Sequence, residues 1–408
     1  MAREPTQQLT RWLNELGRIT DEPGKLTRTF LSPAMRRANA RVGEWMRAAG
    51  LAVREDAVGN LIGRLEGSRP GAKTLLLGSH LDTVRDAGRF DGALGVLLPI
   101  VALDVLRQQG RVLPYAVEVL GFSEEEGVRF SSAYLGSKGF AGTLRAADLK
   151  LRDAAGIQVR DTLETLNGGT FALPRAAHRR SDLLGYLEVH IEQGPVLEAQ
   201  DLAVSVVSAI AGQTRGRLTF HGQAGHAGTT PMNLRRDALA GAAKFISDVE
   251  LIARMRPPLV ATVGTIAVSP GAPNVIPGEV TLSLDVRHPR DVARRAALRR
   301  MLGLAEWTAR RRGLRCTWTL TQDGNAVACD PKLTRVLADT VRKLQGRCPA
   351  LVSGAGHDAV VMSALTPVAM LFVRCRAGLS HHPDEYAAPE DLRVALRATM
   401  AFLERFAG

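Results

Sequence analysis

Apolar residues along the chain follow two patterns, helical spacing and short continuous runs. Residues 1–20 carry apolar side chains every three or four positions, and Ser32 followed by Pro33 marks the start of a second amphipathic helix. Strands that alternate with helices indicate an α/β fold with a largely parallel sheet, in which ligands gather at the carboxyl ends of the strands. We predict helices over 1–20, 32–51 and 92–110, a hairpin over 51–67, and buried strands over 73–84 and 115–127.

The pattern changes between residues 208 and 325, where the order becomes strand, helix, two strands, helix and strand. This βαββαβ order is that of the ferredoxin-like split motif. The α/β pattern resumes afterwards, so we expect one discontinuous domain, residues 1–208 and 325–408, around an inserted domain at 209–324. The predicted elements are strands at 214–222, 260–270, 278–288 and 314–322 with helices at 235–255 and 291–311, then helix 330–345, strand 366–375 and helix 389–407.

Charge and cysteine content change this picture little. The 408 residues include 53 Lys and Arg against 41 Asp and Glu, a net charge of +12, which raises the alternative of a polyanion-binding or nucleic-acid-binding protein. The positive residues are spread through helices, and only 5% of residues are aromatic, so bases would find few stacking platforms. We therefore expect no nucleic-acid partner, and we expect the charge to attract an anionic substrate instead.

The four cysteines form no CxxC pair, so neither a zinc knuckle nor a disulfide framework is indicated. A reducing cytoplasm is the simplest location for such a chain. We find no secretory leader and no uncharged apolar run of about 18 residues, the length that a membrane span needs. The expectation is a cytoplasmic protein without a membrane partner.

Candidate chemistry begins with the stretch GFSEEEGVRF, which places three adjacent glutamates at the end of a predicted strand. Three like charges repel one another, unless divalent cations offset them. Histidines and acids also end other apolar runs of the same sheet, and imidazole with carboxylate but no thiolate suits zinc, manganese or cobalt. These residues are His80, Asp82, Asp91, His190, Glu192, His381 and His382.

Strand periodicity adds two expectations and leaves one question open. Residues i and i+2 of a strand face the same way, so Asp82 is expected to accept a hydrogen bond from the ring of His80, and Glu192 from that of His190. Periodicity does not decide which glutamate of the three binds a metal and which acts as a base. The competing interpretation is structural: a single histidine at a strand end, or a glutamate run in a turn, is usually solvated.

Eight motifs in order along nearly the whole chain resemble one family, the allantoate amidohydrolase and N-carbamoyl-L-amino acid hydrolase group. This group is a branch of the two-metal aminoacylase and carboxypeptidase superfamily. The resemblance implies a metal-dependent exopeptidase-like catalytic domain with an inserted ferredoxin-like lid and dimerisation domain. The motifs are GSHLDTV, GRFDGALGV, EEEGVRF, HIEQGPVLE, GQAGHAGTTPM, PNVIPGEVTLSLDVRH, SGAGHDA and GLSHHPDE.

The resemblance implies two divalent metal ions per subunit, zinc or manganese, with cobalt or nickel as further options. His80 and His190 would bind one ion, Glu126 and His381 the other, and Asp91 would bridge them. Glu125 becomes the general base and Asp82 a supporting catalytic residue. Peptidase relatives usually have an acid at the position of His190, so the imidazole argues against a peptidase.

Six residues are implied to hold the substrate: Gln193, His226, Asn274, Arg287, Gly356 and His357. His226 resembles a lid histidine that reaches a substrate oxygen, often in the partner subunit of a homodimer, while an arginine fork grips a carboxylate bidentately. Turn chemistry is the structural alternative for Asn274 in its Pro-flanked loop. The lid would hinge near residues 208 and 325. The sequence departs from the family at Ala377, where relatives commonly have a second glycine.

The implied reaction is metal-dependent hydrolysis of a ureido C–N bond in a small carboxylate. With allantoate the products would be ureidoglycine, ammonia and carbon dioxide. The alternative substrate is an N-carbamoyl-L-amino acid, which would give the free amino acid. The segments AIAGQTR and LFVRC resemble the allantoate-cleaving members.

Overall fold

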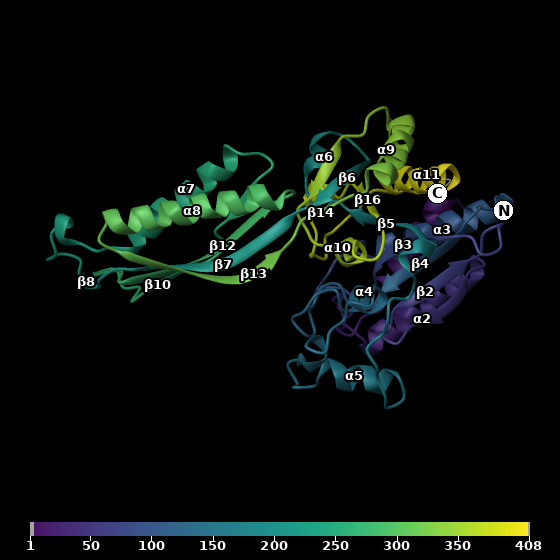
Figure 1. Ribbon diagram of the computed structural model, residues 1–408, viewed down its shortest axis with the longest axis horizontal. Helices are drawn as coiled ribbons and strands as arrows, with labels where there is room; N and C mark the ends of the chain where they lie inside the picture. Colours follow the sequence, from purple (N-terminus) through teal and green to yellow (C-terminus); the bar gives the residue numbers. More distant parts are fainter. Residues whose placement is uncertain (1–3, 407–408) are drawn as a thin grey trace. The chain divides into compact units, whose positions relative to one another are not determined.

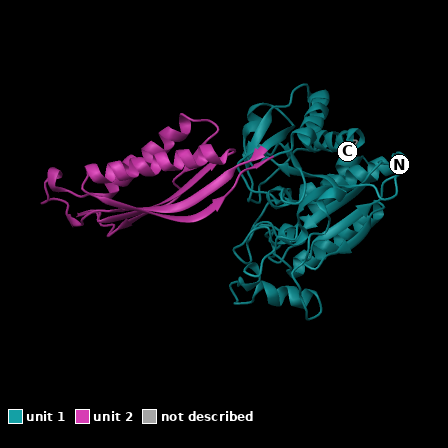
Figure 2. Cartoon of the chain, viewed as in Figure 1, with its two compact units in different colours: residues 1–208, 329–408 teal, residues 209–328 magenta. Residues whose placement is uncertain are grey.

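The computed structural model describes residues 4–406, which form two compact units (Figures 1 and 2). Unit 1 combines the residues up to Ser208 with those from Cys329 onward, and unit 2 spans Ala209–Ala328. The ends of the predicted first and last helices, residues 1–3 and 407, lie outside the described residues. No helix among residues 4–406 is both long and apolar enough to cross a membrane.

The main sheet has nine strands in the order β1-β2-β4-β3-β5-β16-β6-β14, with β15 beside β6. The four strands β4, β3, β5 and β16 are parallel to one another, whereas the flanking pairs are antiparallel. The sheet is therefore mixed rather than largely parallel, partly because the short β1–β2 turn can join only antiparallel strands. Strand bounds are β1 Ala52–Glu55, β2 Leu61–Leu65, β3 Thr74–His80, β4 Ala116–Phe122, β5 Leu183–Ile191, β6 Val204–Ile210, β14 Val327–Ala328, β15 Ala350–Ser353 and β16 Val368–Val373.

Helices cover both faces of this sheet. Leu75 and Leu77 of β3 join a core with helices α1, α2, α3, α9 and α11, and Phe122 of β4 packs on Phe140 of α4 on the other face. Helix α3 is buried almost all round, which explains its continuous apolar sequence. Helix bounds are α1 Pro5–Leu16, α2 Pro33–Ala48, α3 Ala93–Gln108, α4 Leu135–Phe140, α5 Val159–Leu166, α6 Val196–Ala199, α9 Pro331–Gln345, α10 Asp358–Met362 and α11 Pro389–Arg405.

Unit 2 contains a five-stranded antiparallel sheet in the order β10-β12-β7-β13, with β9 also paired to β12. Alternate residues of β12 are buried in a core shared with α7 and α8, as the half-buried strand pattern predicts. Its elements are β7 Gly212–His221, β8 Gly225–His226, α7 Ala238–Arg254, β9 Val260–Thr262, β10 Ile266–Ser269, β11 Val275–Ile276, β12 Glu279–His288, α8 Asp291–Arg311 and β13 Arg315–Gly324.

The strand predicted over 260–270 is wrong as one element, because the structure has two short strands there. The hydroxyl of Ser283 accepts the backbone N–H groups of Gly264 (3.1 Å) and Thr265 (2.9 Å) between β9 and β10. A side chain therefore takes the hydrogen bonds that a continuous ladder would have made.

Candidate metal centre

The four parallel strands of the main sheet all bring candidate ligands to their carboxyl ends. His80 is the last residue of β3, and His190 precedes the last residue of β5. The three glutamates follow β4, and His381 lies in the loop after β16. Asp91 lies in the loop between β3 and α3. Segments far apart in sequence thus meet at one edge of the sheet, where α/β folds bind their ligands.

Asp91 lies at the centre of this cluster, and each of its two carboxylate oxygens lies near a different group of residues. Its Oδ1 lies 3.2 Å from Nε2 of His190 and 3.9 Å from Nε2 of His80. Its Oδ2 lies 3.2 Å from Nε2 of His381, and that nitrogen lies 3.3 Å from Oε1 of Glu126. Asp91 therefore belongs to two sets of three potential ligands, one on each side.

The donor types and spacings of both sets fit divalent cations. With metal–ligand bonds of 2.0–2.2 Å, neighbouring ligand atoms of a tetrahedral site are about 3.4 Å apart. The contacts of Asp91 with the three histidines range from 3.2 to 3.9 Å. Each set offers three ligands, the number that catalytic zinc sites use while keeping a position for water or substrate.

The imidazoles are oriented by main-chain carbonyl groups. Nδ1 of His80 lies 3.0 Å from the carbonyl oxygen of Asp82, and Nδ1 of His190 lies 2.9 Å from that of Ile191. A carbonyl can only accept, so Nδ1 carries the proton and Nε2 is the ligand atom. Gly92 has a φ of +63°, and a Cβ there would lie 2.4 Å from the ring of His80, so this position requires glycine.

One of the two expectations for the supporting carboxylates needs correction. Oδ1 of Asp82 lies 3.4 Å from Nδ1 of His80. Burial would lower the pKa of His80, but the hydrogen bond of its ring to Asp82 helps to raise this pKa. The same carboxylate also accepts the N–H groups of Glu125 (3.0 Å) and Glu126 (3.1 Å). Glu192 accepts the N–H groups of Val196 and Leu197 at the start of α6, both at 2.8 Å, instead of a proton of the ring of His190. A free N–H at a helix start competes well for a nearby carboxylate.

The three adjacent glutamates have three different environments. Glu124 points inward and accepts the N–H of Gly127, and burial next to Asp82 raises its pKa well above the ordinary range. Burial likewise raises the pKa of Glu125, whereas Glu126 faces Asp91 and His381. Strand alternation does not explain this arrangement, because β4 ends at Phe122 before the three glutamates. Glu125 and Glu126 both lie within ligand distance of His80, and only Glu126 also joins the set with Asp91 and His381.

The electrostatics of the cluster favour positive charge at its centre. Burial would raise the pKa of Asp91, but hydrogen bonds from His190 and His381 outweigh it and hold the pKa well below the usual range. Hydrogen bonds to Asp91 and Glu126 raise the pKa of His381 to about 10. A proton or a divalent cation can supply this charge, and a cation binds the neutral imidazole.

Two predicted substrate residues lie behind the His190 side of the centre. The ring of His357 packs edge to face on that of His190, with 4.5 Å between centroids, and its Nε2 lies 2.7 Å from the hydroxyl of Ser353. Burial and the neighbouring His190 hold the pKa of His357 well below its usual value, so its ring is neutral. A Cβ at Gly356 would lie 2.0 Å from the hydroxyl of Tyr134, which sequence reasoning did not single out.

A second set of residues that the sequence analysis missed supports Asp91 directly. Ser380 and Glu385 flank the predicted ligand in the motif GLSHHPDE, so the motif itself was the available signal. Gln193, a predicted substrate residue, donates from Nε2 to Asp91 at 3.2 and 3.3 Å and to Ser380 at 3.1 Å. Gln193 and His381 both have positive φ, near +55°, a strained conformation that clusters at functional sites.

The other three predicted substrate residues lie in unit 2, at two ends of its sheet. Val275 of β11 pairs with His226 of β8, and the carbonyl of Asn274 accepts the N–H of Ala227, which joins the two predicted residues in one exposed loop region. Arg287 lies near the far end of β12, where its guanidinium donates to both oxygens of Asp285 at 3.0 and 2.8 Å. The sheet therefore separates His226 and Asn274 from Arg287.

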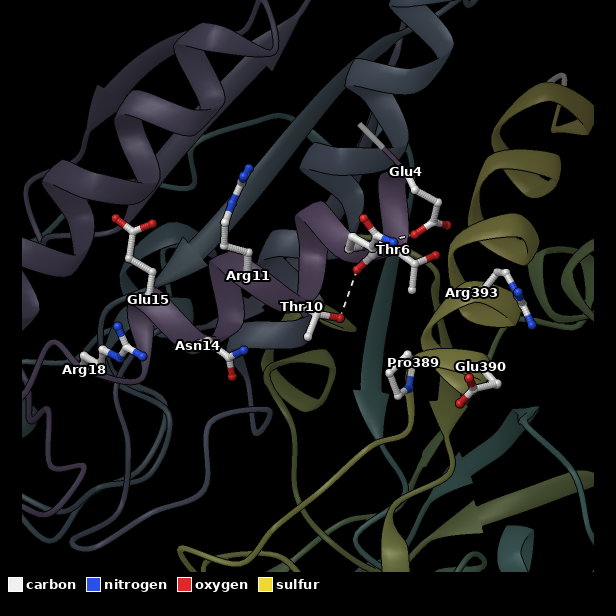
Figure 3. Close-up of a pocket in the computed structure, with 11 residues that line it drawn as sticks. Glu4, Thr6, Thr10, Arg11, Asn14, Glu15, Arg18, Pro389, Glu390 and Arg393 are labelled. Atoms are coloured by element: carbon white, nitrogen blue, oxygen red, sulfur yellow. Dashed lines mark hydrogen bonds between the residues drawn. The ribbon is translucent and has the colours of Figure 1, made fainter. Parts of the chain in front are cut away.

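A cavity of about 950 Å³ in unit 1 has a different lining from the centre. It lies between α1 and the start of α11, among Thr10, Arg11, Asn14 and Arg393 (Figure 3). Guanidinium and carboxylate groups alternate around it, and His80, His190 and His381 are not among its lining residues. The clustered ligands, not the volume of this cavity, identify the candidate site.

One protein family model matches most of the chain. The family model described as peptidase family M20/M25/M40 matches residues 76–405, which covers every candidate ligand. The chain belongs to this family. The predicted resemblance and the α/β fold class are thereby confirmed, and the M20 family consists of metal-dependent enzymes.

Individual members resemble the chain over almost its full length. Allantoate deiminase of Arabidopsis thaliana is 41% identical, over 96% of this chain and 81% of that protein. N-carbamoyl-L-amino acid amidohydrolase of Geobacillus stearothermophilus is 40% identical, over 95% of both chains. The crystal structure of a hydantoinase/carbamoylase family amidase from Burkholderia multivorans superposes with a TM-score of 0.93 at 32% identity, covering 99% of this chain and 98% of that one.

Proposed function

We propose that this M20 family protein hydrolyses a ureido C–N bond in a small carboxylate, with allantoate as its main substrate. The products would be ureidoglycine, ammonia and carbon dioxide. The observation that carries the proposal is the centre around Asp91, which has an imidazole at position 190 and Glu125 beside it. The allantoate deiminase of Arabidopsis thaliana, 41% identical over 96% of the chain, supports the choice of substrate.

The centre is proposed to hold two divalent cations, zinc or manganese, with cobalt or nickel as further options. His80, His190 and Asp91 would hold one, and Asp91, Glu126 and His381 the other. When bound, such ions supply Lewis acidity that polarises a carbonyl group and lowers the pKa of water. The mixed imidazole and carboxylate donors suit borderline cations rather than calcium or magnesium.

Glu125 is the proposed general base. Burial raises the pKa of its carboxyl group, so the ionised form has a high affinity for a proton. It would take the proton of the attacking water and return it to the departing nitrogen. Asp82 holds the N–H of Glu125 at 3.0 Å and that of Glu126 at 3.1 Å, so one carboxylate fixes the base and a ligand together.

Substrate recognition is proposed to need a second copy of the chain. Glu279 and Arg287 are eight positions apart on β12, about 27 Å at the usual strand rise, and His226 lies beyond the Glu279 end. A small carboxylate cannot span that length. We therefore infer a homodimer in which Arg287 of one subunit binds the substrate carboxylate while His226 and Asn274 come from the other. Gln193, Gly356 and His357 would complete the pocket.

The second candidate substrate class is N-carbamoyl-L-amino acids. The relative from Geobacillus stearothermophilus named for this activity is 40% identical over 95% of both chains, almost as similar as the allantoate deiminases. The same centre would release ammonia and carbon dioxide and leave the free amino acid. Both substrates present a ureido group and a carboxylate, so the centre alone does not separate them.

One assay separates these candidates. The protein loaded with manganese or zinc is incubated with allantoate and with a series of N-carbamoyl-L-amino acids, and ammonia release gives kcat/KM for each. We expect allantoate to give the highest value. A higher kcat/KM for an N-carbamoyl-L-amino acid would make that compound the main substrate and allantoate the alternative. No release from either, together with a salt-sensitive shift of duplex DNA, would instead favour the polyanion-binding alternative.

A further inference from the structure

Glu385 has its carboxylate buried against the loop that carries Asp91. Its side chain is 2% exposed, and Oε1 accepts the N–H groups of Phe90 (2.8 Å) and Asp91 (3.0 Å). Oε2 accepts the hydroxyl of Ser380 at 3.0 Å. A Cβ at Gly88 would lie 2.3 Å from the carboxylate, so the loop packs closely on it.

The Asp91 loop has no regular structure of its own to hold it. Residues 81–92 are in neither a helix nor a strand, and Glu385 reaches them from 294 positions away in sequence. A carboxylate that accepts two N–H groups of the loop therefore replaces the ladder that a strand would have provided. Main-chain bonds from Thr83 and Ala87 to residues 28 and 26 hold the first part of the loop, and Glu385 holds the N–H groups of Phe90 and Asp91.

Ser380 connects Glu385 to the side chain of Asp91 as well. The hydroxyl oxygen accepts from Nε2 of Gln193 at 3.1 Å, and its single proton has two carboxylates within reach. These are Oε2 of Glu385 at 3.0 Å and Oδ2 of Asp91 at 3.3 Å. The shorter contact favours Glu385 as the acceptor of this proton. Oδ2 of Asp91 then keeps a lone pair for the position that His381 and Glu126 also face.

We propose that Glu385 is the positioning residue of the bridging carboxylate: it anchors the backbone of Asp91 and takes the Ser380 proton, which keeps a lone pair of Asp91 Oδ2 available to a cation. This inference rests on the two-cation centre of the proposed function. It assigns to Glu385 a role in metal affinity that acts through Asp91, without contact to a cation or to the substrate.

Glu385→Gln tests the proton assignment. The amide oxygen must accept from the two backbone N–H groups, so its NH2 group faces Ser380 and donates to it. The Ser380 proton then turns to Oδ2 of Asp91 and occupies a ligand lone pair. We expect zinc binding, measured by calorimetric titration of the apo protein, to weaken about 10- to 100-fold, the usual effect of such supporting groups.

Adding Ser380→Ala to Glu385→Gln removes the redirected proton and should restore at least half of the lost affinity on a logarithmic scale. If Glu385 only stabilised the fold, the double variant would bind zinc no more tightly than Glu385→Gln. This outcome would overturn the proposal, even if Glu385→Gln is partly unfolded. Asp384→Asn is the matched control, since it removes an exposed carboxylate from the same loop and should leave the titration unchanged.

Titration of the wild-type protein distinguishes failure of the Glu385 role from failure of the two-cation centre. Two equivalents bound by the wild type and by Glu385→Gln with equal affinity would refute the role of Glu385 alone. Failure of the wild-type protein to bind zinc or manganese would refute the two-cation centre, and the role of Glu385 with it. Thermal unfolding of each apo variant reports separately on the fold.

Discussion

The candidate ligands of unit 1 and the candidate substrate residues of unit 2 differ in how they are held. His80, His190 and Asp91 are at most 5% exposed, and main-chain groups or neighbouring carboxylates fix each of them. His226 and Asn274 are exposed on a short two-stranded ladder. One region is arranged before any ligand arrives, whereas the other presents its side chains to solvent.

This difference follows from the cost of burying charge. A buried carboxylate or imidazole without partners costs several kcal/mol, so a metal centre inside a protein must be held by hydrogen bonds from its surroundings. An exposed histidine imposes no such cost. Substitutions of the buried candidate ligands in unit 1 should therefore alter metal binding and stability along with turnover, while those at the exposed positions of unit 2 should alter turnover alone.

The largest effect is expected for Glu125→Gln. The amide keeps the shape of the side chain but cannot take a proton from water, so kcat should fall at least about 1,000-fold, within the range attributed to general base catalysis. Elemental analysis should still find the wild-type metal content, because Glu126 and not Glu125 faces Asp91 and His381. Near wild-type turnover would exclude the role. Loss of metal would mean that Glu125 is itself a ligand.

His226→Ala should reduce kcat about 100-fold, the usual loss when one donor to a developing oxyanion is removed, and leave the melting temperature unchanged. Its side chain is exposed and its only hydrogen bond among the described residues is to the N–H of Gly228. Met232→Ala, which removes a side chain that is 78% exposed from the segment following His226, is the control. A large drop in melting temperature for His226→Ala would show a structural role instead.

The dimer proposal can be tested by mixing two inactive variants. If His226 acts in the partner's site, a dimer of one Glu125→Gln subunit and one His226→Ala subunit contains one intact site. After subunit exchange at equal amounts, about a quarter of wild-type activity should return for a closed two-fold dimer. No recovery, with exchange verified by a mass-tagged subunit, would place His226 and Glu125 of the same chain in one site.

A smaller effect is expected for Arg287→Ala, which should raise KM for carboxylate substrates about 10- to 100-fold and change kcat little. Arg287→Lys should recover only part of this, because an ammonium group lacks the planar fork. Arg215 also pairs with Asp285, at 2.8 Å, so Arg215→Ala is a matched control for loss of that ion pair. Equal KM changes in both variants would assign the effect to Asp285.

The sequence predicted the regions where chemistry lies better than the contacts that support it. Strand ends such as His80 and His190 can be read from apolar runs, because parallel strands present their carboxyl ends at one edge. The partners of these residues depend on segments that meet only after folding, as Glu385 meets the Asp91 loop across 294 positions. Glu192 shows the same limit, because its carboxylate accepts N–H groups at the start of α6 instead of a proton of His190.

The smallest effect concerns Ala377, where the family resemblance implied a second glycine. Its φ is +55°, and its N–H donates to Glu198 at 2.8 Å, so the left-handed backbone is maintained by a specific contact. Relieving this conformation gains about 1–2 kcal/mol, and the greater freedom of glycine in the unfolded chain costs about 0.5–1 kcal/mol. Ala377→Gly should therefore raise the melting temperature by about 1–2 °C and leave kcat unchanged. A lower melting temperature would mean that the methyl group of Ala377 contributes packing beside the His381 loop.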